Sequence, residues 1–215
     1  MKTTAFILIL LSNSLLLTAQ LHKGQWMVGG TADFSHGITE YSISNFNNRT
    51  KQTVYNFFPR VGYFFADRFV VGPRIQISHS KTNAKFVNYA SVGSELLRDT
   101  KESGVGLGAF ARYYFLKPQT KFNAFAEAAY SYSFEKVTSQ TQQISPSYSE
   151  SHIESKYRAN NFSLMAGPVL FLSPKVSFEL SIGYAYGKGT DEISNYDRKI
   201  SRVAFGTGFH VFLGR

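Results

Sequence analysis

Apolar and polar residues alternate with a period of two along the chain, most clearly in two segments joined by a short turn, residues 104–115 and 122–134. In each segment one face carries alanine, other aliphatic residues and aromatic residues. The opposite face is small, polar or charged, and it includes Arg112 and Glu127. Successive side chains of a β-strand point to opposite faces of the sheet. The pattern therefore predicts an antiparallel hairpin with lipid on one side and a packed polar interior on the other.

Further segments alternate in the same way, and in total we predict about eight strands. They cover about residues 25–35, 53–65, 69–80, 104–115, 122–134, 158–172, 176–186 and 200–213. Short turns alternate with long polar loops, which cover about residues 36–52, 81–102, 136–157 and 187–199. An even number of strands with this alternation predicts an all-β fold, an eight-stranded antiparallel up-and-down transmembrane β-barrel. A sandwich would have shorter and more evenly spaced strands.

A soluble eight-stranded, lipid-binding barrel of the lipocalin type is the main alternative fold. A lipocalin turns its apolar face inward around a ligand, whereas a membrane barrel turns it outward. Here the non-apolar face carries many glycines, which leave room inside a narrow barrel but would make a poor solvent-facing surface. It also carries six charged residues in mid-strand, which we expect to form an interior polar network: Arg60, Arg74, Arg112, Glu127, Glu179 and Arg202.

The N-terminus has the pattern of a secretory signal peptide. Lys2 supplies a positive charge, and residues 5–17 form an apolar stretch that is too short to span a membrane as a helix. We expect residues 1–20 to be removed, with cleavage near Ala19 or Gln20, and residues 21–215 to form one barrel domain. No later run approaches the roughly 18 apolar residues that a transmembrane helix needs.

Composition and charge narrow the expected partners. The formal net charge is +9, but no run of about 5–8 Lys and Arg residues appears, so nucleic acid is not an expected partner. Contact with an anionic lipid surface explains the scattered cations more simply. The 20 Phe and 13 Tyr residues suit a protein that crosses two membrane interfaces. The chain has no cysteine, which excludes disulfides and thiolate metal sites.

Three segments carry a resemblance to a known family, residues 58–72, 104–115 and 204–213. They are similar to the small outer-membrane β-barrels of Gram-negative bacteria, the type of the OmpA transmembrane domain and OmpX. The similarity is greatest to the outer membrane protein beta-barrel domain proteins of Bacteroidetes. The resemblance implies an outer-membrane location, contact with lipopolysaccharide, and insertion by machinery that reads a C-terminal aromatic residue. That residue would here be Phe212, three residues before the end of the chain.

The candidate chemistry is sparse. Side chains just fill the interior of an eight-stranded barrel, so we interpret the six charged residues as a structural network that plugs the lumen. A narrow ion-conducting barrel is one alternative. The five histidines show no spacing that predicts convergence with a nucleophile and an acid, and the glycine motifs lack a nucleotide-binding context. We predict no catalytic, cofactor-binding or metal-binding residues and no enzyme activity, with a lipid A-modifying enzyme as a further alternative.

The predicted function is structural, or an interaction at the cell surface. Loops on a rigid scaffold commonly carry binding functions. We therefore expect the long loops to face outside and to offer a binding surface for an extracellular ligand, such as a host, phage or matrix component.

Overall fold

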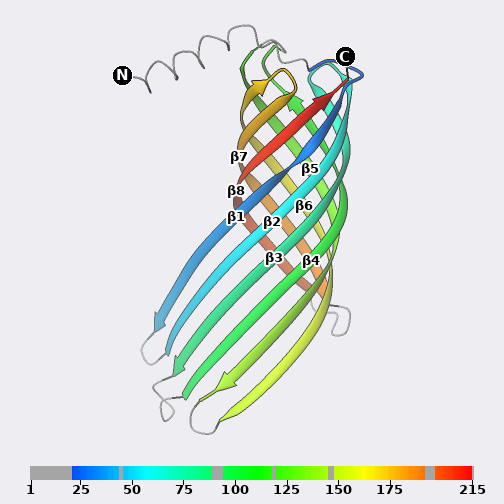
Figure 1. Ribbon diagram of the computed structural model, residues 1–215. Coiled ribbons are helices and arrows are strands. Elements are labelled where there is room, and N and C mark those ends of the chain that lie inside the picture. The colour runs from blue at the N-terminus through cyan, green and yellow to red at the C-terminus, as the bar shows by residue number, and fades with distance from the viewer. Residues whose placement is uncertain are drawn as a thin grey trace, which may run out of the picture.

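The computed structural model describes residues 21–43, 46–88, 94–117, 120–144, 148–191 and 197–214. Its strands are β1 (Trp26–Ile43), β2 (Phe46–Ala66), β3 (Phe69–Asn88), β4 (Ser94–Tyr114), β5 (Phe122–Gln143), β6 (Ser149–Ser173), β7 (Val176–Asp191) and β8 (Asp197–Leu213). Each strand pairs with the next and β8 pairs with β1, which closes the barrel (Figure 1). The predicted antiparallel up-and-down barrel is confirmed. The predicted signal peptide, residues 1–20, lies outside the described residues.

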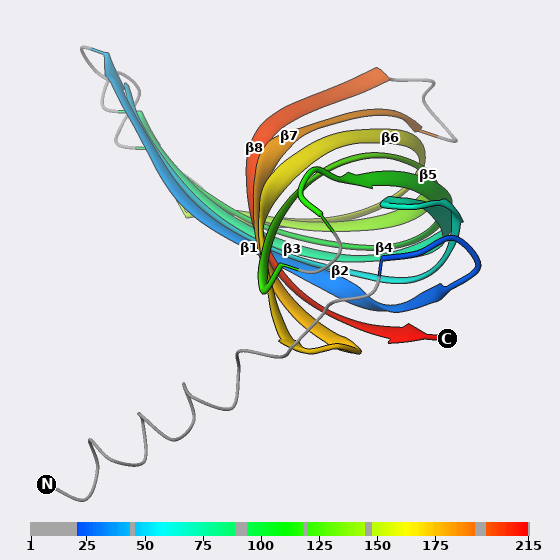
Figure 2. The same ribbon diagram turned by 90° about the horizontal axis from the view of Figure 1, so that it is seen from above.

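The two ends of the barrel differ in how far the strands run beyond the closed ring. The β2–β3, β4–β5 and β6–β7 turns lie at one end, together with both ends of the described chain (Figure 1). At the other end several strands run on past the ring and curve away as an open sheet (Figure 2). Outer-membrane barrels project farther on the extracellular side than on the periplasmic side, so the curved sheet faces the outside. No helix in the described residues is long and apolar enough to cross a membrane.

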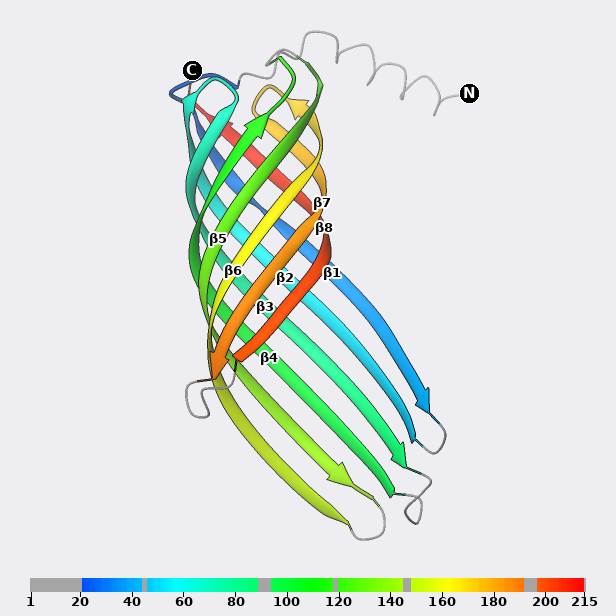
Figure 3. The same ribbon diagram turned by 180° about the vertical axis from the view of Figure 1, so that it is seen from behind.

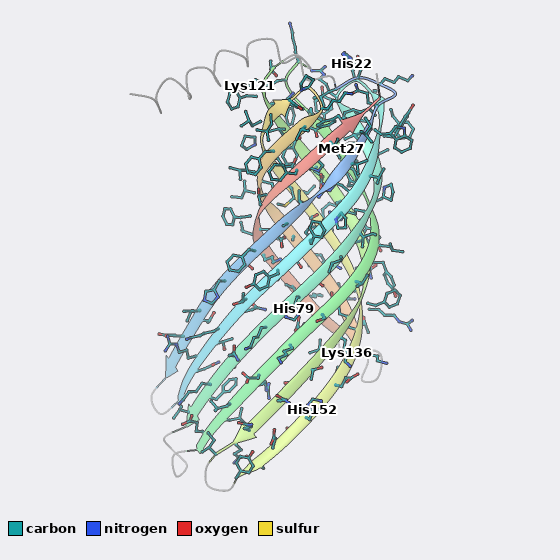
Figure 4. All side chains as sticks on the ribbon, in the orientation of Figure 1. His22, Met27, His79, Lys121, Lys136 and His152 are labelled. Carbon is teal, nitrogen blue, oxygen red and sulfur yellow. The ribbon has the colours of Figure 1, made fainter. Side chains whose placement is uncertain are left out.

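The apolar face of the sheet points outward. Leu107 is 71% exposed and Phe205 is 61% exposed, although both are large and apolar. Figure 4 shows many aromatic rings around the outside of the part of the barrel next to the short turns. The alternate residues, among them Arg112 and Glu127, are buried inside the ring. An apolar outer surface suits contact with lipid, and the lipocalin alternative is therefore wrong.

The prediction of four long loops is wrong for most of their length, because the strands continue through them. Pairing of β1 with β2 extends to Ile43 and Phe46, and pairing of β5 with β6 extends to Gln143 and Ser149. Outside the membrane both faces of a sheet meet water, so the apolar alternation that marks a strand disappears although the hydrogen-bond ladder continues. The outward-facing apolar residues form a band around the barrel, which we call the apolar band. Beyond it the strands continue as what we call the outer extension, residues 35–43, 46–54, 79–88, 94–103, 135–143 and 149–157.

The barrel closes where β8 pairs with β1, a contact that we call the seam. It joins Trp26–Asp33 of β1 to Gly206–Leu213 of β8 and includes no other pairs in the described residues. In hydrocarbon every backbone N–H and C=O must find a partner within the protein, so the seam is what makes the sheet stable in lipid.

We predict that the close approach of β4 and β5 depends on Gly108. A Cβ atom at this position would lie 2.0 Å from the backbone oxygen of Tyr130. We expect Gly108→Ala to lower the free energy of unfolding by about 1–3 kcal/mol, because the backbone must shift. Urea unfolding in lipid vesicles, followed by the fluorescence of Trp26, the single tryptophan, measures the change.

Gly37→Ala is the matched control, because a Cβ atom there would meet nothing within 4 Å. We expect this variant to differ from the wild type by no more than about 0.5 kcal/mol. Equal stability of the two glycine variants would contradict the close packing of β4 against β5.

Candidate functional site

The periplasmic end of the lumen is filled by apolar side chains that point inward, which we call the floor. Its members are Leu21, Met27, Phe64, Val70, Phe110, Tyr114, Phe125, Ala129, Val169, Phe171 and Phe212. Leu21 precedes β1 and is fully buried. Its carbonyl accepts a hydrogen bond from the backbone N–H of Arg68 at 3.0 Å, so the chain before β1 is part of the floor. Met27 marks this end of the barrel in Figure 4.

A polar contact outside the membrane holds the same N-terminal segment in place. The backbone N–H of Lys23 donates to the carboxylate of Asp67, in the β2–β3 turn, at 2.9 Å. This hydrogen bond lowers the pKa of the Asp67 carboxyl below its ordinary value, since it stabilises the charged form.

A layer of buried ion pairs lies directly above the floor and is centred on Glu127. One oxygen of this carboxylate accepts hydrogen bonds from Arg60 and, at 2.7 Å, from Nε of Arg112. Its other oxygen lies 4.0 Å from Nη1 of Arg74. Arg112 also donates to both oxygens of Glu179, at 2.5 and 3.0 Å. All five side chains are at least nine-tenths buried, so each charge depends on its partners.

The register of the sheet explains why Glu127 is needed. Arg60 and Arg74 are direct partners across β2 and β3, an arrangement in which like charges repel. Glu127 is the direct partner of Arg112 across β4 and β5 and reaches all three arginines from there. The guanidinium of Arg112 also lies 4.1 Å from the ring centre of Phe125, which couples this layer to the floor.

A polar cavity of about 410 Å³ fills the lumen above the ion-pair layer. Asn56 donates to Asp33 in its wall at 2.5 Å, and Ser131 donates to Gln76 at 2.5 Å. The floor and the ion-pair layer close the lumen below it. The interior is therefore a cup that is sealed toward the periplasm and polar toward the outside.

The six residues of the predicted network do not all lie together. Five of them form the ion-pair layer, whereas the sixth, Arg202 of β8, lies apart from it and has its Nη2 atom 4.0 Å from Asp33 of β1. The sequence reasoning left Asp33, Asn56 and Gln76 out of the network. All three occupy inward-facing positions in the alternation of their strands, and this could have identified them from the sequence. The buried His210 was also left out, and its Nδ1 atom lies 3.4 Å from Glu179.

Three of the five histidines, His36, His79 and His152, lie on the outer extension. His79 Nδ1 is 3.1 Å from Ser103 Oγ, and His36 Nδ1 is 2.8 Å from Thr53 Oγ1; both pairs are exposed. His152 is exposed on β6 (Figure 4). Within the described part of the chain, no cluster of three or more His, Asp and Glu residues is arranged to hold a metal ion.

Comparison with known proteins gives a family match. The sequence matches the family described as Outer membrane protein beta-barrel domain over residues 18–187. No curated protein matches the chain.

Solved structures show similarity at low sequence identity. OprG from Pseudomonas aeruginosa is 12% identical, with 93% of this chain and 100% of that chain covered and a TM-score of 0.44. Neisserial surface protein A is 17% identical, with 88% and 97% covered and a TM-score of 0.41. A major outer membrane protein from Thermus thermophilus is 11% identical, with 89% and 100% covered and a TM-score of 0.41.

We predict that Glu127→Gln destabilises the barrel by about 3–5 kcal/mol, because a neutral amide leaves the buried arginines without compensating charge. The matched control is Glu154→Gln, which removes an exposed partner of Lys136 on the outer extension. We expect no measurable change from the control, since exposed ion pairs contribute little. Urea unfolding in vesicles compares both with the wild type, and a Glu127→Gln variant of unchanged stability would contradict the account of this layer.

Proposed function

We propose that this chain, which belongs to the Outer membrane protein beta-barrel domain family, is a structural protein that also interacts with partners at the cell surface. It is an integral outer-membrane β-barrel protein. The finer proposal is that it acts neither as an enzyme nor as an open channel, and that its outward cavity and outer extension carry its interactions.

The sealed floor is the observation that carries this proposal. Phe64, Tyr114 and Phe171 are fully buried at the periplasmic end, and the ion-pair layer lies directly above them. Filling the lumen of an eight-stranded barrel in this way leaves no wide aqueous path. A molecule in the cavity above the ion-pair layer would have to enter from the outside or from the membrane.

The outer extension supplies a surface for partners. Exposed ion pairs cross its strands, including Glu40 with Arg49 at 2.9 Å and Lys136 with Glu154 at 2.9 Å. The nearby ammonium of Lys136 also lowers the pKa of the Glu154 carboxyl below its ordinary value. Such pairs are weak individually, but each keeps its charge accessible to a partner in water. The cations of this surface also suit contact with phosphate groups of lipopolysaccharide.

Catalysis is not supported by the arrangement of reactive groups. A nucleophile needs a base, and the base needs a third group that orients it. The His79–Ser103 pair lies in the open, on the outer side of the sheet, where water solvates both groups. This favours a binding role over a lipid A-modifying reaction.

We expect the purified protein to produce no stepwise conductance in planar bilayers in about 1 M KCl, because the floor blocks the lumen. An open outer-membrane porin in the same apparatus is the positive control. Reproducible unitary currents from correctly folded protein would contradict the proposal and favour the narrow ion-conducting barrel.

We also expect the outer extension to be dispensable for folding. A variant in which a short turn replaces residues 138–154 removes the tip of the β5–β6 hairpin but keeps every strand in the membrane. It should retain the heat-modifiable mobility of a folded barrel in electrophoresis and lose part of its binding to lipopolysaccharide micelles. Loss of the folded form would show that this hairpin is structural and would remove the argument for a separate interaction surface.

A further inference from the structure

Both strands of the seam continue past the point where their pairing ends. The last pair is Asp33 with Gly206, yet β1 runs on to Ile43 and β8 begins at Asp197. Figure 3 shows β1 and β8 diverging beyond this point, with β1 following the outer extension and β8 staying with β7. Beyond the seam these two edges have no sheet partner among the described residues except β2 and β7.

The split begins within the apolar band. Phe34 on β1 and Phe205 on β8 follow directly after the last pair and point outward, 54% and 61% exposed. An open sheet edge is not tolerated against hydrocarbon, but it is tolerated where it lines a cavity. The unpaired backbone groups at this point are therefore expected to face a cavity and not the acyl chains of the membrane.

A second pocket, of about 670 Å³, lies at the split. Its outward wall is mainly apolar and aromatic, formed by Phe34, Tyr55, Phe57, Ile77 and Phe205 together with the imidazole of His79. It shares Asp33, Asn56 and Gly206 with the polar cavity inside the barrel. The two spaces therefore adjoin at the end of the seam, with an apolar groove outside and a polar cavity inside.

The polar cavity inside the split contains a hydrogen-bond donor without an acceptor. Arg74 lines the inner cavity and its side chain is 6% exposed. Its Nε atom has no hydrogen-bond partner in the part of the chain that the structure describes. Its nearest carboxylate in an ion pair, that of Glu127, is 4.0 Å away and already accepts hydrogen bonds from two other arginines. A buried guanidinium in this situation lacks an acceptor.

The charges of the ion-pair layer favour an anionic acceptor. The layer holds three arginines, Arg60, Arg74 and Arg112, against two carboxylates, Glu127 and Glu179, which leaves 3 − 2 = +1. Arg202 and Asp33, which lie apart from the layer, pair with each other. Arg60 and Arg112 are fully engaged with these glutamates. Two further carboxylates, Glu102 and Glu135, line the outer part of the cavity and have interactions of their own. The uncompensated positive charge is therefore assigned to Arg74.

We propose that the split between β1 and β8 is a lateral port that binds a single-chain amphiphile with a carboxylate head, of the long-chain fatty acid class. The head accepts a hydrogen bond from Arg74 inside the barrel, and the acyl chain lies in the aromatic groove and extends into the outer leaflet. The proposal assigns a class of ligand to the cavity that opens outward. It therefore rests on the proposed function, in which the lumen is closed at the periplasmic end.

Fluorescence quenching by a brominated fatty acid tests the binding. A Tyr55→Trp substitution in a Trp26→Phe background places the single tryptophan in the groove. In lipid nanodiscs we expect dibromostearate to quench this tryptophan saturably. The matched control is the wild-type Trp26, which faces lipid at the far end of the same seam. Its quenching should rise linearly with dibromostearate, as simple partitioning into lipid requires, and the same linear rise at both positions would overturn the proposal.

Removing the charge of Arg74 or of the ligand tests the assignment of a carboxylate head group. Arg74→Gln should weaken saturable binding about tenfold or more, because one charge-assisted hydrogen bond is lost. Arg49→Gln, which removes an exposed cation of the outer extension, should leave it unchanged. A brominated alcohol of equal chain length should bind the wild type as weakly as dibromostearate binds Arg74→Gln. Equal binding of the alcohol and the acid to the wild type would overturn the carboxylate assignment, even if Arg74→Gln proved unable to fold.

The port itself is tested by closing it. Because the chain has no cysteine, Phe34→Cys with Phe205→Cys can be joined by a bismaleimide that contains a reducible disulfide. Saturable quenching should disappear on cross-linking and return on reduction. The same cross-link at Val28→Cys with Val211→Cys, a pair within the closed seam, should have no effect. Undiminished binding with the port locked would overturn lateral entry. Conductance through the lumen, by contrast, would contradict the proposed function but not the binding of the ligand at the split.

Discussion

The structure depends on one constraint, the need to pair every backbone N–H and C=O group that lies in hydrocarbon. The chain meets it by pairing each strand with the next and returning β8 to β1 over Trp26–Asp33. Once the ring is closed, alternate side chains must point either into lipid or into a narrow lumen. The apolar outer face and the crowded polar interior both follow from this closure.

The interior shows how charges are kept in such a lumen. Glycines such as Gly108 allow the strands to approach closely, and the remaining space takes large side chains in layers. Aromatic rings fill the periplasmic end, and Glu127 neutralises arginines from two neighbouring hairpins just above, β2–β3 and β4–β5. Breaking a buried pair costs far more than an exposed pair contributes, so this layer holds the hairpins in one arrangement. The cup-shaped lumen is a consequence of that order.

The sequence predicted the fold because its strongest signal, alternation in contact with lipid, has a single geometric cause. The same alternation along each strand also predicted which charged residues face inward. It could not predict partners, because these depend on register between strands: Glu127 meets Arg112 directly, whereas Arg202, beyond the end of the seam on β8, reaches back to Asp33 on β1. The outer extension was missed for a different reason, since strands with water on both faces lose their alternation. The burial of Leu21 in the floor, before the first strand, had no signal in the pattern.

The place where closure ends gives the molecule its asymmetry. Below Asp33 the ladder is complete, and above it β1 keeps only its pairing with β2. In an antiparallel sheet, successive residues of a strand bond alternately to its two neighbours. Losing one neighbour therefore frees every second amide of β1 and leaves the others bonded.

Residue-resolved hydrogen exchange of β1 in lipid nanodiscs measures this directly. Our account predicts slow exchange at all amides from Met27 to Asp33, and alternating fast and slow exchange from Phe34 toward Ile43. Uniformly slow exchange along the whole strand would mean that the seam stays closed. Uniformly fast exchange beyond Asp33 would mean that the outer extension is not a sheet, and either result would contradict the account.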